Sequence, residues 1–222
     1  RTRSNVQTEQ CNVIMKEQNY SNPYLISFTA GGLLYDETIS LQPYLNDEKI
    51  ELIANEVKIN KYLQTNSQAA RQRIIQEVKK RYLAVGGNAF LIFNTLDQNE
   101  QRIFIFYTCL KTYGIIFDFI FDVVVEKWLS RDIDVNAGDV LYFLDKKTSN
   151  HLEIDQWTAT TKQKVATVMI RMLKEVGILR DAKIMALDAS DEYWNYFVKI
   201  GEPWFLQACL LNKERRDQIS HV

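Results

Sequence analysis

Residues 155–187 read DQWTATTKQKVATVMIRMLKEVGILRDAKIMAL, and this stretch holds the most legible amphipathic helix of the chain. At about 100° per residue, one stripe of the helix is apolar and the opposite side is polar and basic. Gly177 predicts the end of the helix, because glycine readily takes the positive φ of a helix C-terminus. We expect a short extended or irregular piece after it. The apolar stripe comprises Val165, Val168, Met169, Met172, Leu173 and Val176, and the polar side comprises Thr160, Lys164, Thr167, Arg171 and Lys174.

Two interpretations of this helix stay open on its own pattern. A helix that ends in LKEVGIL before another short element is typical of recognition helices in helix-turn-helix and winged-helix modules. The same pattern is typical of a core helix whose basic side faces solvent, and the periodicity alone favours this second interpretation.

The composition indicates a globular protein that is not a polycation. The 222 residues are 46% hydrophobic and 25% charged, and this length allows one large or two modest domains. Because the formal net charge is −1, any binding of nucleic acid must come from a local basic patch. Two segments lean basic, residues 71–81 with one acid and residues 162–174 with none.

Cysteine, histidine and hydropathy patterns limit the other function classes. Three distant cysteines and two histidines provide no zinc-ligand spacing, so we expect no metal, no cofactor and a reducing cytoplasm. The run TYGIIFDFIFDVVVEKW (112–128) is interrupted by Asp118 and Asp122, and its uncharged stretches are far shorter than the roughly 20 residues of a membrane span. We therefore predict a buried helix there and no membrane association.

Periodicity and capping signals predict a nearly all-α, compact multi-helix protein. We divide it into a flexible polar arm (1–22), an N-terminal helical half (23–113) and a C-terminal helical half (114–222), each half with one helix-turn-helix-like unit. RIFIFYTCL (102–110) is rich in β-formers, but we predict a helix because no strand partner is evident. The predicted helices cover residues 27–43 (capped by Ser27 or Thr29), 46–63, 66–87, 99–113, 114–130, 139–144, 158–177, 190–201 and 203–217.

The helix at 66–87 echoes the helix at 158–177. Each has a Ser or Thr cap, a basic start, an apolar stripe and a terminal glycine. Arg73 and Lys80 lie on its polar side and Lys79 at the edge of that side, whereas Arg71 and Arg81 lie nearer the apolar stripe and are predicted to be structural.

Catalytic signals are weak. Asp118 and Asp122 lie four apart on one helix and could form a metal or acid–base pair, but a structural role with Lys127 or an arginine of another helix is favoured. His151 has no aligned nucleophile, and no nucleophile elbow, phosphate loop or kinase signature occurs. We predict that the protein is not an enzyme.

Four segments, in their order along the chain, resemble the BrxA family of bacterial BREX phage-exclusion systems. The resemblance spans roughly residues 25–187, and it departs where Asp122 replaces an expected Glu and Tyr82 an expected Leu. The N-terminal arm has no counterpart. The segments are SFTAGGLLYDE (27–37), RIIQEVKKRY (73–82), DFIFDVVVEKW (118–128) and TKQKVATVMIRMLKEVGIL (161–179).

The resemblance implies a non-catalytic protein that binds double-stranded DNA in phage defence. It therefore favours DNA contact by the two basic helix sides over the interpretation that these sides only face solvent. Five to seven phosphate contacts are expected, with weak sequence preference, from a monomer that takes no small-molecule substrate. The alternative is an adaptor that assembles other BREX proteins without touching DNA, favoured by the aromatic-rich segment EYWNYFVKIGEPWFLQ (192–207). The predicted DNA-contacting residues are Arg73, Lys79, Lys80, Thr160, Lys162, Gln163, Lys164, Thr167, Arg171 and Lys174, of which Thr160, Gln163 and Thr167 could read bases.

Overall fold

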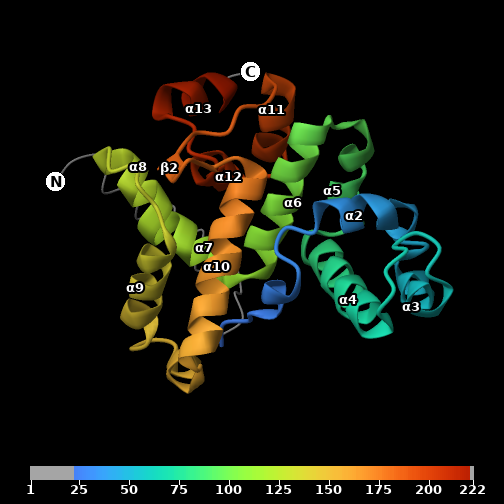
Figure 1. Ribbon diagram of the computed structural model, residues 1–222. Coiled ribbons are helices and arrows are strands. Elements are labelled where there is room, and N and C mark those ends of the chain that lie inside the picture. The colour runs from blue at the N-terminus through green and yellow to red at the C-terminus, as the bar shows by residue number, and fades with distance from the viewer. Residues whose placement is uncertain (1–22, 221–222) are drawn as a thin grey trace.

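The computed structural model describes residues 23–220, and it confirms a nearly all-helical protein (Figure 1). The predicted arm, residues 1–22, lies outside the described residues. The elements up to residue 112 are η1 (Ser27–Ala30), α2 (Tyr35–Leu41), η2 (Gln42–Tyr44), η3 (Ile50–Asn55), α3 (Glu56–Ile59), α4 (Gln68–Val85), α5 (Gly87–Phe90), η4 (Ile92–Thr95) and α6 (Gln98–Thr112). The elements after it are α7 (Gly114–Phe119), η5 (Ile120–Val125), α8 (Glu126–Ser130), α9 (Ala137–Lys147), η6 (Leu152–Gln156), α10 (Ala159–Val176), β1 (Leu179–Arg180), β2 (Lys183–Ile184), α11 (Asp191–Lys199), α12 (Trp204–Ala208) and α13 (Lys213–Ser220).

The two echoing helices form as predicted. The Thr158 hydroxyl accepts a hydrogen bond from the Thr161 amide at the start of α10, and Gly177 ends the helix at φ 92°. All six residues of the predicted apolar stripe of α10 are buried. At the start of α4, the Ser67 hydroxyl accepts the amide of Ala70.

Helix α6 is the centre of the core. The side chain of Asp97 begins it with a capping box to Glu100, and residues 103–110 are all buried. Helices α4, α7 and α10 all contact α6, so it is apolar on every side. This confirms the helix predicted for RIFIFYTCL, and the buried residues of both predicted halves form one continuous cluster. The helical run at 114–130 is also confirmed, with the π-helical segment η5 inside it.

The helix predicted at 27–43 is wrong in its first part. The chain forms one turn of η1, breaks over Gly31–Leu34 and starts α2 only at Tyr35; neither Ser27 nor Thr29 caps a helix. The break arises because the Arg81 guanidinium of α4 donates to the carbonyls of Gly32 and Leu33, at 2.7 and 2.6 Å, which a continuous helix would need for itself. We call residues 27–34 the strap.

Other boundaries also differ. The helix predicted at 203–217 is split into α12 and α13, because Leu210 adopts φ 65° and the Cys209 carbonyl accepts the amide of Leu187 instead of a helical amide. The helix predicted at 139–144 extends over α9, and the one predicted at 46–63 is η3 followed by α3.

The extended piece predicted after α10 is a β-hairpin. Strands β1 and β2 pair antiparallel, and Asp181 and Ala182 turn between them with positive φ at both positions, as a tight two-residue turn requires. Residues 133–135, just before α9, add a third extended piece, since the Ile184 amide donates to the Ile133 carbonyl at 2.7 Å and Asp134 bridges Lys183.

Candidate nucleic-acid interface

The exposed side of α10 follows from its buried stripe. Thr160, Gln163, Lys164, Arg171 and Lys174 are all exposed there, and so is Thr167, whose hydroxyl donates to the Gln163 carbonyl at 2.9 Å. Within residues 23–220, Lys164 and Lys174 have no ion-pair partner. These two ammonium groups are therefore available to an external anion.

Two other basic groups of α10 are matched by carboxylates. Arg171 Nε lies 3.4 Å from Glu175 Oε1, and Lys162 Nζ lies 3.7 Å from Asp145 Oδ1 of α9. Lys162 therefore points towards α9, away from the exposed side of the helix. The sequence window 162–174 holds no acid, yet folding places acids from outside the window beside two of its four cations.

Helix α4 shows the same division. Arg73 is exposed and has no ion pair with any described residue. Lys79 Nζ lies 2.6 Å from Glu51 Oε2, so its charge is matched. Lys80 Nζ lies 3.3 Å from the Ser27 hydroxyl and 5.0 Å from the centre of the Tyr113 ring, and both contacts leave its charge unpaired.

The structural role predicted for Arg71 and Arg81 is confirmed, because both are buried. Arg71 donates to the carbonyls of Val57, Thr65 and Asn66, and Arg81 holds the strap and lies 3.3 Å from Glu77.

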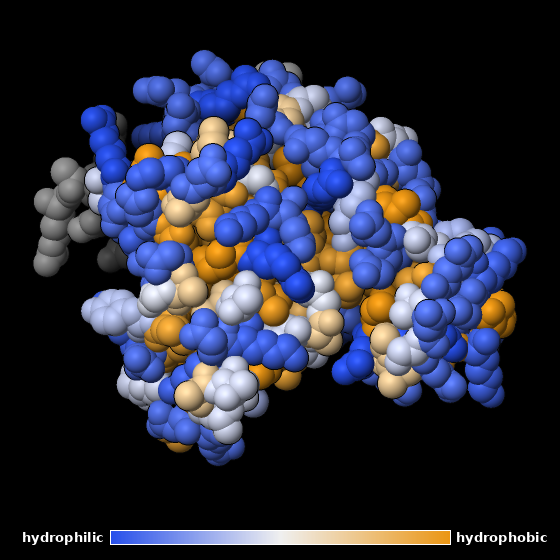
Figure 2. Space-filling view, in the orientation of Figure 1, coloured by the Kyte–Doolittle hydropathy of each residue, from blue (hydrophilic) through white to orange (hydrophobic). Residues whose placement is uncertain are grey.

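The strap lies between helices α4 and α10, and its first turn, η1, contacts both (Figure 1). Lys80 of α4 reaches Ser27 at one end of it, and Arg171 of α10 lies beside Gly32 at the other; a Cβ atom on Gly32 would come within 2.7 Å of Arg171 Nη2. The Leu33 amide donates to Glu175 Oε2 at 3.2 Å. Figure 2 shows the surface hollowed at its lower edge, between the part that carries α9 and α10 and the part that carries α3 and α4. Helices α4 and α10 thus lie on either side of one concave region.

Sequence reasoning missed the hairpin cations. Arg180 and Lys183 flank the turn, both exposed, and Lys183 Nζ lies 2.6 Å from Asp134 Oδ1. An Asn-Gly or Asp-Gly pair would have signalled a two-residue hairpin, but the turn here is Asp-Ala.

The aspartate pair on α7 and η5 has a structural partner. Lys147 Nζ of α9 lies 3.0 Å from Asp118 Oδ2 and 2.8 Å from Asp122 Oδ2. The prediction of Lys127 or an arginine as the partner is therefore wrong for the described residues. Burial alone would lower the pKa of Lys147, but the hydrogen bond to Asp122 and the charge of Asp118 outweigh it and raise that pKa. Lys127 instead pairs with Asp132 and Asp139.

His151 has a packing role. Its ring stacks on Tyr24 with centroids 3.5 Å apart, and its Nδ1 lies 3.1 Å from Glu153 Oε1. Burial, and then the charge of Asp118, raises the pKa of the Tyr24 hydroxyl, which donates to that aspartate. Among residues 23–220, no three His, Cys, Asp or Glu side chains are grouped as a metal site.

In the described part of the chain, no single helix is long and apolar enough to span a membrane. Residues 98–112 and 114–130 together have the required length and apolar character, but the chain bends by 109° between them. Their apolar side chains are largely buried in the core, as predicted for the run at 112–128.

Comparison with known proteins identifies the family. The sequence model of BrxA matches residues 22–195, which include the strap, α4, α10 and the hairpin. The chain belongs to the BrxA family. A relative described as BREX protein BrxA, from Bacillus cereus (strain H3081.97), is 24% identical over 162 residues, which cover 68% of this chain and 81% of the relative. The BrxA family is part of the BREX phage-defence systems.

A solved structure shares the fold. The crystal structure of an uncharacterized protein from Magnetospirillum magneticum superposes with a TM-score of 0.65 at 16% identity, covering 82% of this chain and 96% of that one. At this identity, the likeness concerns the fold alone.

Proposed function

We propose that this BrxA-family protein is a non-catalytic accessory protein of a BREX system that binds duplex DNA with weak sequence preference. One observation carries the proposal: the basic sides of α4 and α10 border the same strap, and Arg73, Lys80, Lys164 and Lys174 carry no carboxylate partner among the described residues. A lysine or arginine without a carboxylate partner in the protein is available to bind a DNA phosphate.

The elements around α10 support this interpretation. An extended piece, helix α9, helix α10 and a hairpin follow one another in the order typical of winged helix-turn-helix modules, with α10 in the position of the recognition helix. The connection between α9 and α10 is longer than the usual turn of about three to four residues, because it contains η6. Thr160 and Gln163 lie in the N-terminal half of α10, where recognition helices contact bases.

The carboxylates lower the expected number of strong phosphate contacts. Lys79, Lys162 and Arg171 must each leave or share a carboxylate before they bind phosphate, so about four full contacts remain instead of the five to seven expected from sequence. We expect one duplex to contact both α4 and α10 of a single protein molecule across the hollow between them.

Fluorescence anisotropy of a labelled random duplex, titrated at several salt concentrations, tests the proposal. At about 0.9 per phosphate contact, the slope of log K against log salt should be about −3 to −4. Affinity should rise with duplex length until one duplex reaches both helices, at a stoichiometry of one to one. Absence of binding at low salt would overturn the DNA-binding proposal, and a stoichiometry of two short duplexes per protein would overturn the shared site.

Glu175→Gln is expected to strengthen duplex binding several-fold. The amide oxygen can still accept the Leu33 amide, but the substitution frees Arg171 from its carboxylate and removes a negative charge beside the strap. Glu214→Gln on α13, an exposed carboxylate outside the proposed DNA surface, changes the net charge equally and should leave affinity unchanged. Weaker binding by Glu175→Gln would mean that the carboxylate positions Arg171 for DNA instead of competing with it.

A further inference from the structure

Lys80 is the unpaired lysine of the proposed interface that other side chains hold in place. Its Nζ donates to the Ser27 hydroxyl of η1 at 3.3 Å and lies 5.0 Å from the centre of the Tyr113 ring. Neither contact neutralises the charge. Lys164 and Lys174 are exposed on α10 and have no comparable side-chain contact in the described part of the chain. The fold therefore orders one lysine of the interface and leaves the other two free to move.

The Tyr113 ring is a fixed support for Lys80. Tyr113 joins α6 to α7 and is fully buried. Phe28 of η1, also fully buried, packs against it edge to face with ring centroids 5.1 Å apart. Ser27 and Phe28 are adjacent in the same turn. One turn of the strap therefore supplies both the hydroxyl that accepts from Lys80 and a ring that holds Tyr113 in place.

The hydrogen bonds of this cluster run in one direction. A lysine ammonium group can only donate, and a carboxylate can only accept. The Tyr113 hydroxyl donates its single proton to Glu77, so at the 3.0 Å contact between Tyr113 and Ser27 the serine donates. The Ser27 oxygen then accepts from Lys80. The series therefore begins at the ammonium group of Lys80 and ends at the buried ion pair of Glu77 with Arg81.

Helix α4 itself places the strap that holds Lys80. The buried Arg81 donates to the carbonyls of Gly32 and Leu33, near the other end of the strap. Ser27, by contrast, is exposed and Lys80 is half-buried, so a phosphate can approach the ammonium group from the solvent. The cluster thus has a buried end that fixes the strap and an open end that carries a positive charge.

We propose that Ser27 and Tyr113 are positioning residues that order Lys80 for contact with a DNA phosphate. The inference rests on the proposed duplex binding and assigns its best-ordered contact. An ammonium group has three donors, and Ser27 accepts from one, so two remain for phosphate oxygens. A side chain that is already ordered loses little rotamer freedom on binding, whereas an exposed one such as Lys164 loses more. For one side chain, this difference corresponds to about two- to tenfold in affinity.

Single lysine variants test this order of strength in the anisotropy assay. Lys80→Met and Lys164→Met each remove one phosphate contact, so each should lower the steepness of log K against log salt by about 0.9. At one salt concentration, Lys80→Met should weaken duplex binding about two- to tenfold more than Lys164→Met. Equal losses, or a larger loss for Lys164→Met, would overturn the proposal.

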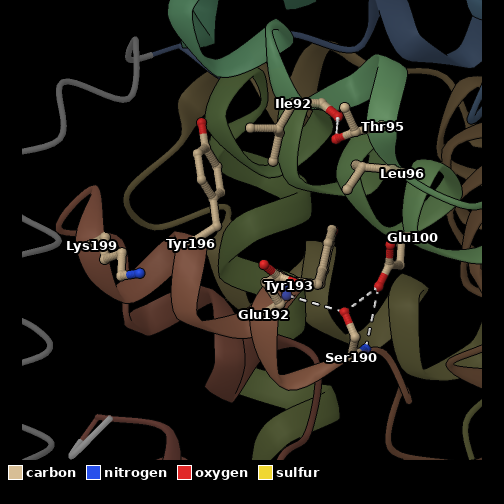
Figure 3. Close-up of a pocket in the computed structure, with 9 residues that line it drawn as sticks. All are labelled: Ile92, Thr95, Leu96, Glu100, Ser190, Glu192, Tyr193, Tyr196 and Lys199. Carbon is tan, nitrogen blue, oxygen red and sulfur yellow. Dashed lines mark hydrogen bonds between the residues drawn. The ribbon is translucent and has the colours of Figure 1, made fainter.

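Lys199→Met is the matched control for charge. Lys199 is exposed on α11, where it lines a cleft near the start of α6, and Figure 3 shows it without a hydrogen bond to the other residues drawn. It lies outside the proposed DNA surface, so its removal changes the net charge equally and should change affinity and salt dependence little. A loss equal to that of Lys80→Met would indicate a response to net charge alone and would also overturn the proposal.

Ser27→Ala tests the positioning itself. The substitution removes a hydroxyl but no charge, so affinity should fall about two- to tenfold while the salt slope stays the same. Ser27→Thr keeps a hydroxyl at this position and should retain most of the affinity. Thr29→Ala, in the same turn, removes a hydroxyl that has no hydrogen bond to a described residue and should have little effect.

A double-mutant cycle separates positioning from a purely structural role. In the Lys80→Met background, Ser27→Ala should weaken duplex binding no further, because the hydroxyl acts through the ammonium group that is then missing. Additive losses would overturn the positioning role and leave duplex binding itself standing. No duplex binding by the unmodified protein at low salt would overturn both.

Discussion

Reversing the charges of Lys164 and Lys174 together to Glu should lower the affinity for duplex DNA at least about 100-fold at physiological salt. Both side chains are exposed on α10 and have no ion pair in the described part of the chain. The substitution therefore removes two of the proposed full phosphate contacts and adds repulsion at the same positions. Stability should change by no more than about 0.5 kcal/mol for each exposed site.

A control with the same change of net charge makes this result specific. Lys199→Glu with Lys213→Glu places the new charges on α11 and α13, outside the proposed DNA surface, and should change affinity little. Anisotropy titrations of both double variants at several salt concentrations compare them directly. Unchanged affinity in the α10 variant would show that α10 is the wrong surface, and equal losses in both would indicate a response to net charge alone.

Local signals in the sequence predicted the two helices that carry the proposed interface. Both ends of α10 could be predicted from sequence because Thr158 and Gly177 cap the helix that they adjoin. Its exposed side could be predicted because it lies opposite the apolar stripe. The course of the strap could not be predicted from sequence. The helix expected at 27–43 is interrupted there because Arg81, which is distant in sequence, donates to the carbonyls that this helix would use for its own hydrogen bonds.

The charges of the interface were harder to predict than its helices. A window of sequence shows no acid near Lys162, yet α9 brings Asp145 to it, and η3 brings Glu51 to Lys79. Lys147 came to Asp118 and Asp122 in the same way, from another helix. Such pairs depend on tertiary packing, so helical periodicity can identify an exposed cation but not whether that cation is already neutralised.

Arg81→Met should reduce the free energy of unfolding by about 3–5 kcal/mol, because breaking a buried ion pair leaves the partner charge uncompensated. Arg81 is 2% exposed, and its removal leaves Glu77 buried with the Tyr113 hydroxyl as its one further side-chain partner among residues 23–220. The Gly32 and Leu33 carbonyls would also lose their donors. Urea denaturation measures the loss. Arg73→Met, an exposed arginine of the same helix, should cost no more than about 0.5 kcal/mol, and an equally small cost for Arg81→Met would contradict the buried-network assignment.

The double variant Arg81→Met with Glu77→Leu then separates stability from strap geometry. Replacing both partners of a buried ion pair by apolar groups restores much of the stability that a single replacement loses. It cannot restore the guanidinium that holds the strap carbonyls, which lie between Lys80 and Arg171. We therefore expect the double variant to recover most of the free energy of unfolding yet bind duplex more weakly than the unmodified protein. Full recovery of both properties would show that the strap keeps its course without Arg81, and that the spacing of the two basic sides is set by the α6 core alone.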